Sequence, residues 1–223
     1  VIRRRIEKLF LLENLTEAYI CSLSCRSVIY KGLFLAEQLT SFYPDLNDER
    51  FTSNFAIYHQ RYSTNTFPSW SLAQPFRVLA HNGEINTINE TKLDDPQLGP
   101  YVDDIKPIVQ PGSSDSASLD GVFEVLVRTH RELPEVKSLL IPEAWEKSKT
   151  LKQAHRDFYE YANGVMEPWD GPAAICAYGG RWALAGMDRN GLRPLRYVVT
   201  GDGLLVVGSE TGMVKVQETT VLE

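Results

Sequence analysis

The sequence has 223 residues, of which 43% are hydrophobic and 23% are charged, a composition typical of a globular protein with one substantial core. Its 29 acidic residues outnumber its 23 basic ones, which argues against nucleic acid as the main partner, because nucleic-acid-binding proteins usually carry a basic surface. No run of roughly 18 apolar residues indicates a membrane span, so we expect no membrane partner.

The three cysteines, Cys21, Cys25 and Cys176, lack the spacing of a metal site. We therefore expect reduced and mostly buried thiols, which fits an intracellular compartment. No cluster of His, Asp and Glu has metal-ligand spacing either, so we expect no metal in this chain.

The first twelve residues predict an amphipathic helix, because apolar side chains recur there at helical spacing. Arg3-Arg4-Arg5 is the one basic cluster, and we expect it to form a solvated face of that helix. Two short strands are predicted next, over 17–24 and 27–31, followed by a short helix over 34–42.

An aromatic-rich strand is predicted over residues 54–63, and it leads into the polar run Ser63-Thr64-Asn65-Thr66. Arg61 lies near its end. An arginine at a strand end is most often a surface charge, but the hydroxyl and amide groups that follow also allow a binding site.

A further strand is predicted over residues 76–80, just before His81-Asn82-Gly83-Glu84. Asn-Gly is the commonest two-residue hairpin signal, so this stretch alone favours a turn. The alternative is functional: an Asn side chain and a Gly backbone N–H at one point are two neutral donors of the kind that stabilise an oxyanion in acyl transfer.

A strong helix is predicted after Ser114, because Leu119, Val122, Phe123 and Leu126 follow the helical repeat. Asp115 at its start has two compatible interpretations. It can stabilise the first turn, by about 1 kcal/mol, or place a carboxylate at the mouth of a pocket.

The last third changes period from helical to alternating. After two helices over 135–140 and 149–163, four strands separated by glycine-containing hairpin signals are predicted over 172–178, 181–188, 195–200 and 204–208. Hairpins without βαβ units predict an α+β fold with antiparallel sheets, in one domain.

Five segments together resemble the class II glutamine amidotransferases, which are N-terminal-nucleophile hydrolases, in the form found in the glutamate synthase family. They are His59–Thr66, His81–Thr87, Ser114–Ser116, Met166–Pro172 and Asp188–Pro194. The resemblance implies an αββα sandwich of antiparallel sheets flanked by helices, formed by residues 1–223 but incomplete at its N-terminus.

The resemblance also implies roles for individual residues. Arg61 matches the arginine that binds the α-carboxylate of L-glutamine, and Asp115 matches the carboxylate that pairs with its α-ammonium group. Thr64 lies where related enzymes place a substrate-contacting threonine. Asn82, through its side chain, and Gly83, through its backbone N–H, match the oxyanion hole.

Two departures from the family pattern stand out. The family nucleophile is a cysteine at the mature N-terminus, but this sequence starts at Val1, and its three cysteines do not match that position. We therefore expect the segment that carries the nucleophile to be missing, and the 223 residues alone to be inactive. A loop after Ile88 is also expected to be shortened.

The implied activity is hydrolysis of L-glutamine to glutamate and ammonia, with transfer of the ammonia to 2-oxoglutarate by synthase domains of the same polypeptide. FMN and an iron–sulfur cluster are implied for those other domains, and no cofactor for this chain. An NAD(P)H-linked small electron-transfer subunit or ferredoxin is the implied redox partner. The alternatives are another class II amidotransferase and a catalytically silent glutamine-binding scaffold.

Overall fold

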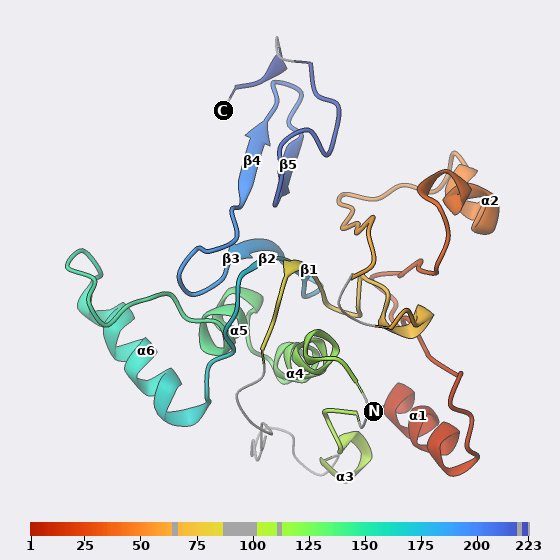
Figure 1. The fold of residues 1–223 in the computed structure, drawn as a ribbon, viewed down its shortest axis with the longest axis horizontal. Coiled ribbons are helices and arrows are strands. Elements are labelled where there is room, and N and C mark those ends of the chain that lie inside the picture. Colours follow the sequence, from red (N-terminus) through yellow and green to blue (C-terminus); the bar gives the residue numbers. More distant parts are fainter. Residues whose placement is uncertain (64–66, 87–101, 111–112, 218–219, 223) are drawn as a thin grey trace. The chain divides into compact units, whose positions relative to one another are not determined.

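The computed structural model describes the chain except for residues 64–66, 87–101, 111–112, 218–219 and 223. Its contacts divide the chain into two compact units, one of residues 1–80 with 93–125 and one of residues 81–92 with 126–223. Helices and antiparallel sheets are both present, which confirms the predicted α+β class (Figure 1).

The helices of the first unit begin with α1 (Ile2–Leu12) and α2 (Leu39–Phe42), where helices are predicted over 1–12 and 34–42. A short α3 (Val102–Ile105) precedes α4 (Asp115–Arg128), whose last turn belongs to the second unit. Three 3₁₀ turns complete the set: Ala36–Gln38, Pro44–Asn47 and Trp70–Leu72.

The strands predicted over 17–24, 27–31 and 54–63 are wrong, because the structure assigns no strand to these residues. The last segment does alternate, since Phe55, Ile57 and His59 are half-buried while their neighbours are exposed. Strand-forming residues stabilise a sheet only through cross-strand packing, and these segments pair with no strand in the described part of the chain.

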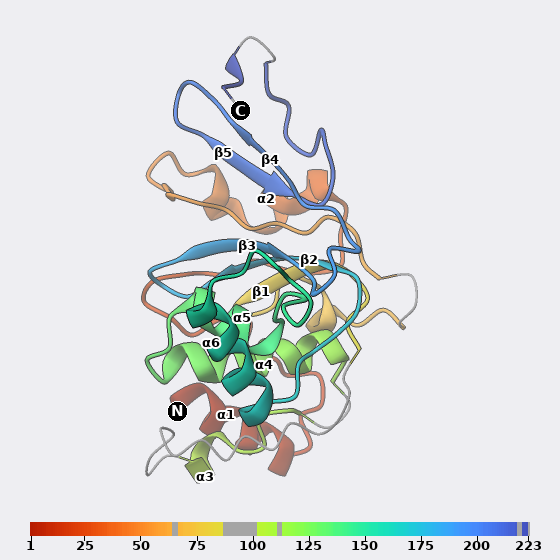
Figure 2. The ribbon, with the colours of Figure 1, turned by 90° about the vertical axis from the view of Figure 1, so that its left-hand side faces the viewer.

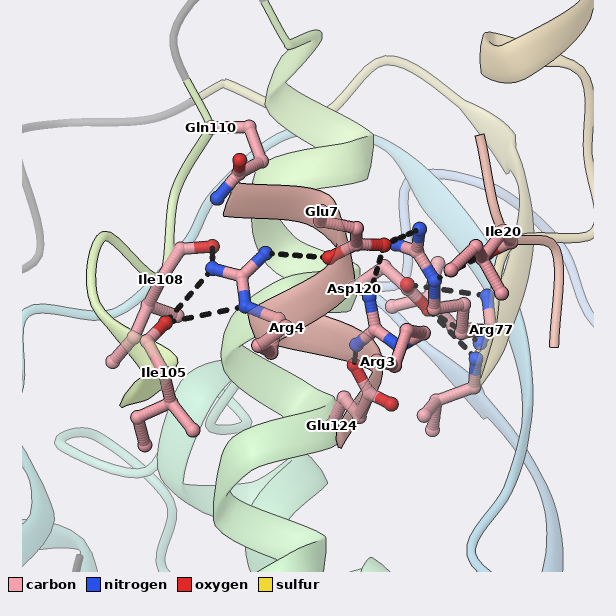
Figure 3. Close-up of polar contacts among 12 residues, drawn as sticks. Arg3, Arg4, Glu7, Ile20, Arg77, Ile105, Ile108, Gln110, Asp120 and Glu124 are labelled. Atoms are coloured by element: carbon pink, nitrogen blue, oxygen red, sulfur yellow. Dashed lines mark hydrogen bonds and ion pairs between the residues drawn. The ribbon is translucent and has the colours of Figure 1, made fainter. Parts of the chain in front are cut away.

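The arginines of α1 are not a solvated face, which corrects the prediction for Arg3 and Arg4. The Arg3 side chain is buried among carboxylates, where it pairs with Glu7 at 2.6 Å and with Glu124 of α4 (Figure 3). Arg4 also pairs with Glu7, and only Arg5 is exposed as expected. Glu7 lies on the same helix, three or four residues further on, whereas Glu124 comes from a distant part of the sequence, so the burial of Arg3 depends partly on a contact that local pattern cannot reveal.

Asp120 of α4 holds the backbone that leads into the first strand. Its carboxylate is 1% exposed and accepts hydrogen bonds from the N–H groups of Arg77, Val78 and Leu79, at 3.1, 2.8 and 3.0 Å. Burial, together with the charge of Glu124, raises the pKa of Asp120 to about 6 despite these hydrogen bonds.

This raised pKa predicts a pH dependence of stability. Between about pH 4 and 6 the native state keeps the proton of Asp120, whereas the unfolded state loses it. The stabilisation of the folded state by this group is therefore full at about pH 4 and is lost as the pH rises through 6. Urea unfolding of the wild type and Asp120→Asn at pH 4 and 6.5 measures the effect. The stability advantage of the wild type should shrink at the higher pH, and an advantage that stays constant or grows contradicts the prediction.

The second unit contains α5 (Leu133–Leu140), α6 (Gln153–Val165) and the remaining strands. Strands β2 (Ala173–Tyr178) and β3 (Ala183–Met187) form an antiparallel hairpin, as do β4 (Arg196–Val199) and β5 (Leu205–Gly208). These strands confirm the four predicted in this region. Figure 2 shows α5 and α6 on one side of the β2–β3 hairpin and the β4–β5 hairpin toward its other side.

Strand β1 (Leu79–Gly83) lies at the edge of a sheet in the order β1-β2-β3. It starts later than the strand predicted over 76–80 and includes Asn82 and Gly83, so Asn-Gly does not form the hairpin turn that this stretch taken alone favours. The hairpin predicted at Asn190-Gly191 is also wrong, because β3 and β4 belong to different sheets.

The core of the second unit includes residues of both β2 and α5. Ile175 and Ala177 of β2 are fully buried, and so are Val136 and Leu140 of α5. No helix in the described part of the chain is long and apolar enough to cross a membrane.

Candidate functional site

The predicted site residues fall into two groups. Asn82 and Gly83 are the last two residues of β1 and belong to the second unit, whereas Arg61 and Asp115 belong to the first. Thr64 lies outside the described residues. The structure therefore places Asn82 and Gly83 at one strand end of the second unit, and Arg61 and Asp115 on the first.

The side chain of Asn82 is half-buried and held at one end. Its amide nitrogen donates a hydrogen bond to the hydroxyl oxygen of Ser209, at 2.9 Å. A primary amide has two N–H donors, so one remains for another acceptor. Ser209 was missed by sequence reasoning, because it lies 127 residues away from Asn82 and follows an ordinary strand.

Gly83 sits where only glycine fits. Its φ is +136°, and a Cβ atom built on it would lie 1.8 Å from the carbonyl oxygen of Pro172. The next residues continue as an antiparallel pair, because Glu84 N–H donates to Pro172 and Asn86 N–H donates to Asp170, both at 2.9 Å. The exposed end of β1 is therefore fixed against the segment 170–172.

Gly171, on the opposite segment, makes the same kind of close backbone approach. Its φ is +116°, and a Cβ atom there would lie 2.2 Å from the carbonyl oxygen of Glu84. Trp169, two residues earlier, is buried, and its N–H donates to Leu140 of α5 at 2.7 Å. The segment Met166–Pro172 is thus the backbone support of the Asn82-Gly83 strand end, a role that its sequence did not indicate.

Gly171→Ala is expected to destabilise the protein by about 1–3 kcal/mol, because the new Cβ meets a backbone carbonyl and the positive φ is strained. Gly164→Ala in α6 is the matched control. Nothing lies within 4 Å of its added Cβ, so it should be neutral or stabilising by up to about 1 kcal/mol. Denaturant unfolding of both variants measures the difference, and equal stabilities would contradict the role given to Gly171.

Asp188 organises the segment 188–194. Its buried carboxylate accepts hydrogen bonds from four backbone N–H groups at 2.9–3.0 Å: those of Ala173, Asn190, Leu192 and Arg193. Burial alone would raise the pKa of Asp188, but these four hydrogen bonds outweigh it and lower the pKa below its usual value. The segment is therefore a loop built around one carboxylate.

The two remaining residues lie on the first unit. Asp115 is the exposed first residue of α4, and the helix is capped by Ser114, whose hydroxyl accepts a hydrogen bond from Ala117 N–H at 3.2 Å. Arg61 is exposed in a segment without regular structure.

None of the three cysteines is buried, which corrects the prediction of mostly buried thiols. Cys25 is exposed, and Cys21 and Cys176 are half-buried. Partial burial raises the pKa of the Cys176 thiol, which lowers the fraction of reactive thiolate there. Within the described residues, no group of three or more His, Cys, Asp or Glu side chains could hold a metal ion.

Comparison with known proteins identifies the family. The sequence model of the family described as "Glutamine amidotransferases class-II" matches residues 1–223. The chain is 60% identical to the "Glutamate synthase [NADPH] large chain" of Azospirillum brasilense over 232 residues, which cover 100% of this chain and 15% of that protein.

Two further relatives agree. The chain is 43% identical to the "Glutamate synthase [NADPH] large chain" of Bacillus subtilis, with 100% of this chain and 15% of that protein covered. It is 46% identical to the "Ferredoxin-dependent glutamate synthase, chloroplastic" of Oryza sativa, with 92% and 13% covered. The chain thus spans about a seventh of the length of these relatives. The match to the family model along all 223 residues shows that the chain belongs to the class II glutamine amidotransferases.

Proposed function

We propose that residues 1–223 form the glutamine amidotransferase domain of a glutamate synthase, which hydrolyses L-glutamine to glutamate and ammonia. The observation that carries the proposal is the end of β1, where a half-buried Asn82 amide stands next to the Gly83 backbone. The similarity to NADPH-linked and ferredoxin-dependent glutamate synthases supports the choice within the family.

The proposed oxyanion hole consists of the Asn82 side-chain N–H and the Gly83 backbone N–H. Successive residues of an antiparallel strand turn their N–H groups to opposite sides. Glu84 and Asn86 donate toward residues 170–172, so we expect the Gly83 N–H to point to the other side, at the sheet edge formed by β1. Both donors are neutral and preorganised, which suits them to stabilise developing negative charge.

The proposed substrate contacts use groups of complementary charge. Arg61 binds the α-carboxylate of glutamine through its planar guanidinium fork, and Asp115 pairs with the α-ammonium group. Thr64 is a further proposed contact. Both charged side chains are exposed, which is compatible with these roles.

The proposed nucleophile is an N-terminal cysteine of the longer protein, whose α-amino group acts as its general base. Cys21, Cys25 and Cys176 do not suit this role, because each lies within the chain and has no free α-amino group. We further propose that the two described hairpins belong to the αββα sandwich of this enzyme class.

For the whole protein, we propose transfer of the ammonia to 2-oxoglutarate in the synthase domains, where FMN and an iron–sulfur cluster would be bound. The electron donor would be a small NAD(P)H-linked subunit or ferredoxin, and the location the cytoplasm or a plastid. The names of the relatives contain NADPH, ferredoxin and, for the rice protein, chloroplastic, which supports these choices.

The proposal predicts that Arg61→Ala in the full-length protein weakens glutamine binding by about 10–100-fold, because a charge-assisted hydrogen-bonded pair is lost. Arg50→Ala is the control, since Arg50 is exposed and pairs only locally with Asp48, at 2.6 Å. Calorimetric titration with glutamine gives both affinities. Equal affinities would contradict the assignment of Arg61.

Ammonia release from glutamine by the full-length protein tests the proposed activity itself. A folded wild-type protein that binds glutamine but releases no ammonia would instead favour the silent glutamine-binding scaffold.

A further inference from the structure

The Asn82 amide needs a partner to keep a productive orientation. The terminal torsion of an Asn side chain is broad, so the amide can rotate and present its carbonyl oxygen where its N–H should be. A carbonyl oxygen at that position would repel an oxyanion. In the structure the amide nitrogen donates to Ser209 Oγ at 2.9 Å, which restrains rotation of the amide and keeps its nitrogen on the Ser209 side.

Ser209 is itself held by its neighbours in the chain. It follows β5 directly, after the buried Gly208. On its other side, Glu210 forms an ion pair with Arg193 at 3.0 Å. The backbone N–H of Arg193 is one of the four that Asp188 binds. The loop built around Asp188 therefore borders the turn that presents the Ser209 hydroxyl.

We propose that Ser209 is a positioning residue of the glutaminase reaction, which acts by orienting the Asn82 amide toward the oxyanion. The inference rests on the proposed function. It assigns Ser209 a role distinct from that of Asn82, because the hydroxyl would act through its contact with the Asn82 amide. It also gives the segment Asp188–Pro194 a function, which is to support this turn.

The test measures kcat and KM for glutamine hydrolysis in the full-length protein. Ser209→Ala removes the acceptor and should lower kcat about tenfold, less than the 10²–10³-fold typical for loss of an oxyanion donor, with KM unchanged within about twofold. Ser209→Thr keeps the hydroxyl and should retain most of the wild-type kcat. Ser148→Ala, in the loop before α6, is the matched control and should behave as the wild type.

A double variant separates orientation from an independent effect. If Ser209 acts only through Asn82, the pair Asn82→Ala and Ser209→Ala should be no slower than Asn82→Ala alone. Additive losses would overturn the inference, as would an unchanged kcat in Ser209→Ala or an effect confined to KM. If Ser209→Ala does not fold, Ser209→Cys replaces it as a near-isosteric variant with a weaker acceptor, and an unchanged kcat there would also overturn the inference.

The result also separates this inference from the proposed function. A wild-type protein that releases ammonia, together with an unaffected Ser209→Ala, refutes the role of Ser209 alone. A folded wild type that releases no ammonia refutes the proposed function and with it the positioning role.

Discussion

Asn82→Ala in the full-length protein is expected to lower kcat for glutamine hydrolysis on the order of 10²–10³-fold, with little change in KM. The physical reason is that, in the proposed oxyanion hole, the Asn82 N–H interacts with an oxygen whose charge develops only in the transition state. The ground-state amide of glutamine gains much less from the same donor, so its binding is largely unaffected. Steady-state kinetics of ammonia release measures both constants.

Asn82→Asp sharpens this test. It preserves the shape of the side chain but replaces the N–H donor by a carboxylate, which should repel the oxyanion, so its loss of kcat should be at least as large as that of Asn82→Ala. Asn47→Ala is the control, because Asn47 is exposed and donates only to the backbone of Thr40. A change confined to KM would remove Asn82 from the oxyanion hole.

Gly83 offers no comparably clean test. Any side chain there would meet the backbone carbonyl of Pro172, so a loss of activity in Gly83→Ala could reflect a displaced strand end. The backbone donor and its structural support are inseparable at this position. The Asn82 side chain, by contrast, can be shortened without disturbing the hydrogen bonds that Glu84 and Asn86 make to the segment 170–172.

The parts of the fold that local sequence encodes were predicted. Helix α4 follows from the spacing of its apolar residues, and β2–β5 follow from alternating runs with glycines at two of the connections. The strand predicted over 54–63 shows where local pattern fails: the alternation is present, but no described strand pairs with it. Pairing is a tertiary property, and periodicity cannot reveal it.

The site divides in the same way. The order of the motifs predicted Asn82 and Gly83 as site residues, but the residues that hold these two in place come from far along the chain. Ser209 and Gly171 carry no local signal for these contacts, because each is defined by a residue on another segment. The Asn-Gly stretch taken alone favours a turn for the same reason, since the antiparallel pairing with residues 170–172 that keeps it extended is not visible in the sequence around it.

Glu7→Gln is expected to destabilise the protein by about 3–5 kcal/mol, the range typical for breaking a buried ion pair. The Glu7 carboxylate accepts hydrogen bonds from three arginines, Arg3 at 2.6 Å, Arg77 at 2.7 Å and Arg4 at 3.1 Å (Figure 3). The side chain of Glu7 is only 13% exposed, and the three arginines are 10–13% exposed. Neutralising Glu7 leaves these guanidinium groups buried with much of their compensating charge removed.

Hydrogen exchange of the full-length protein gives the local free energy of opening for α1 and for the backbone of residues 77–79. Both should lose protection in Glu7→Gln, because Glu7 of α1 binds Arg77, the residue whose N–H Asp120 holds at the approach to β1. Glu13→Gln, at the exposed end of the same helix, should change protection by less than about 0.5 kcal/mol. Loss of protection confined to α1 would mean that the cluster stabilises only the helix, and that the approach to β1 depends on Asp120 alone.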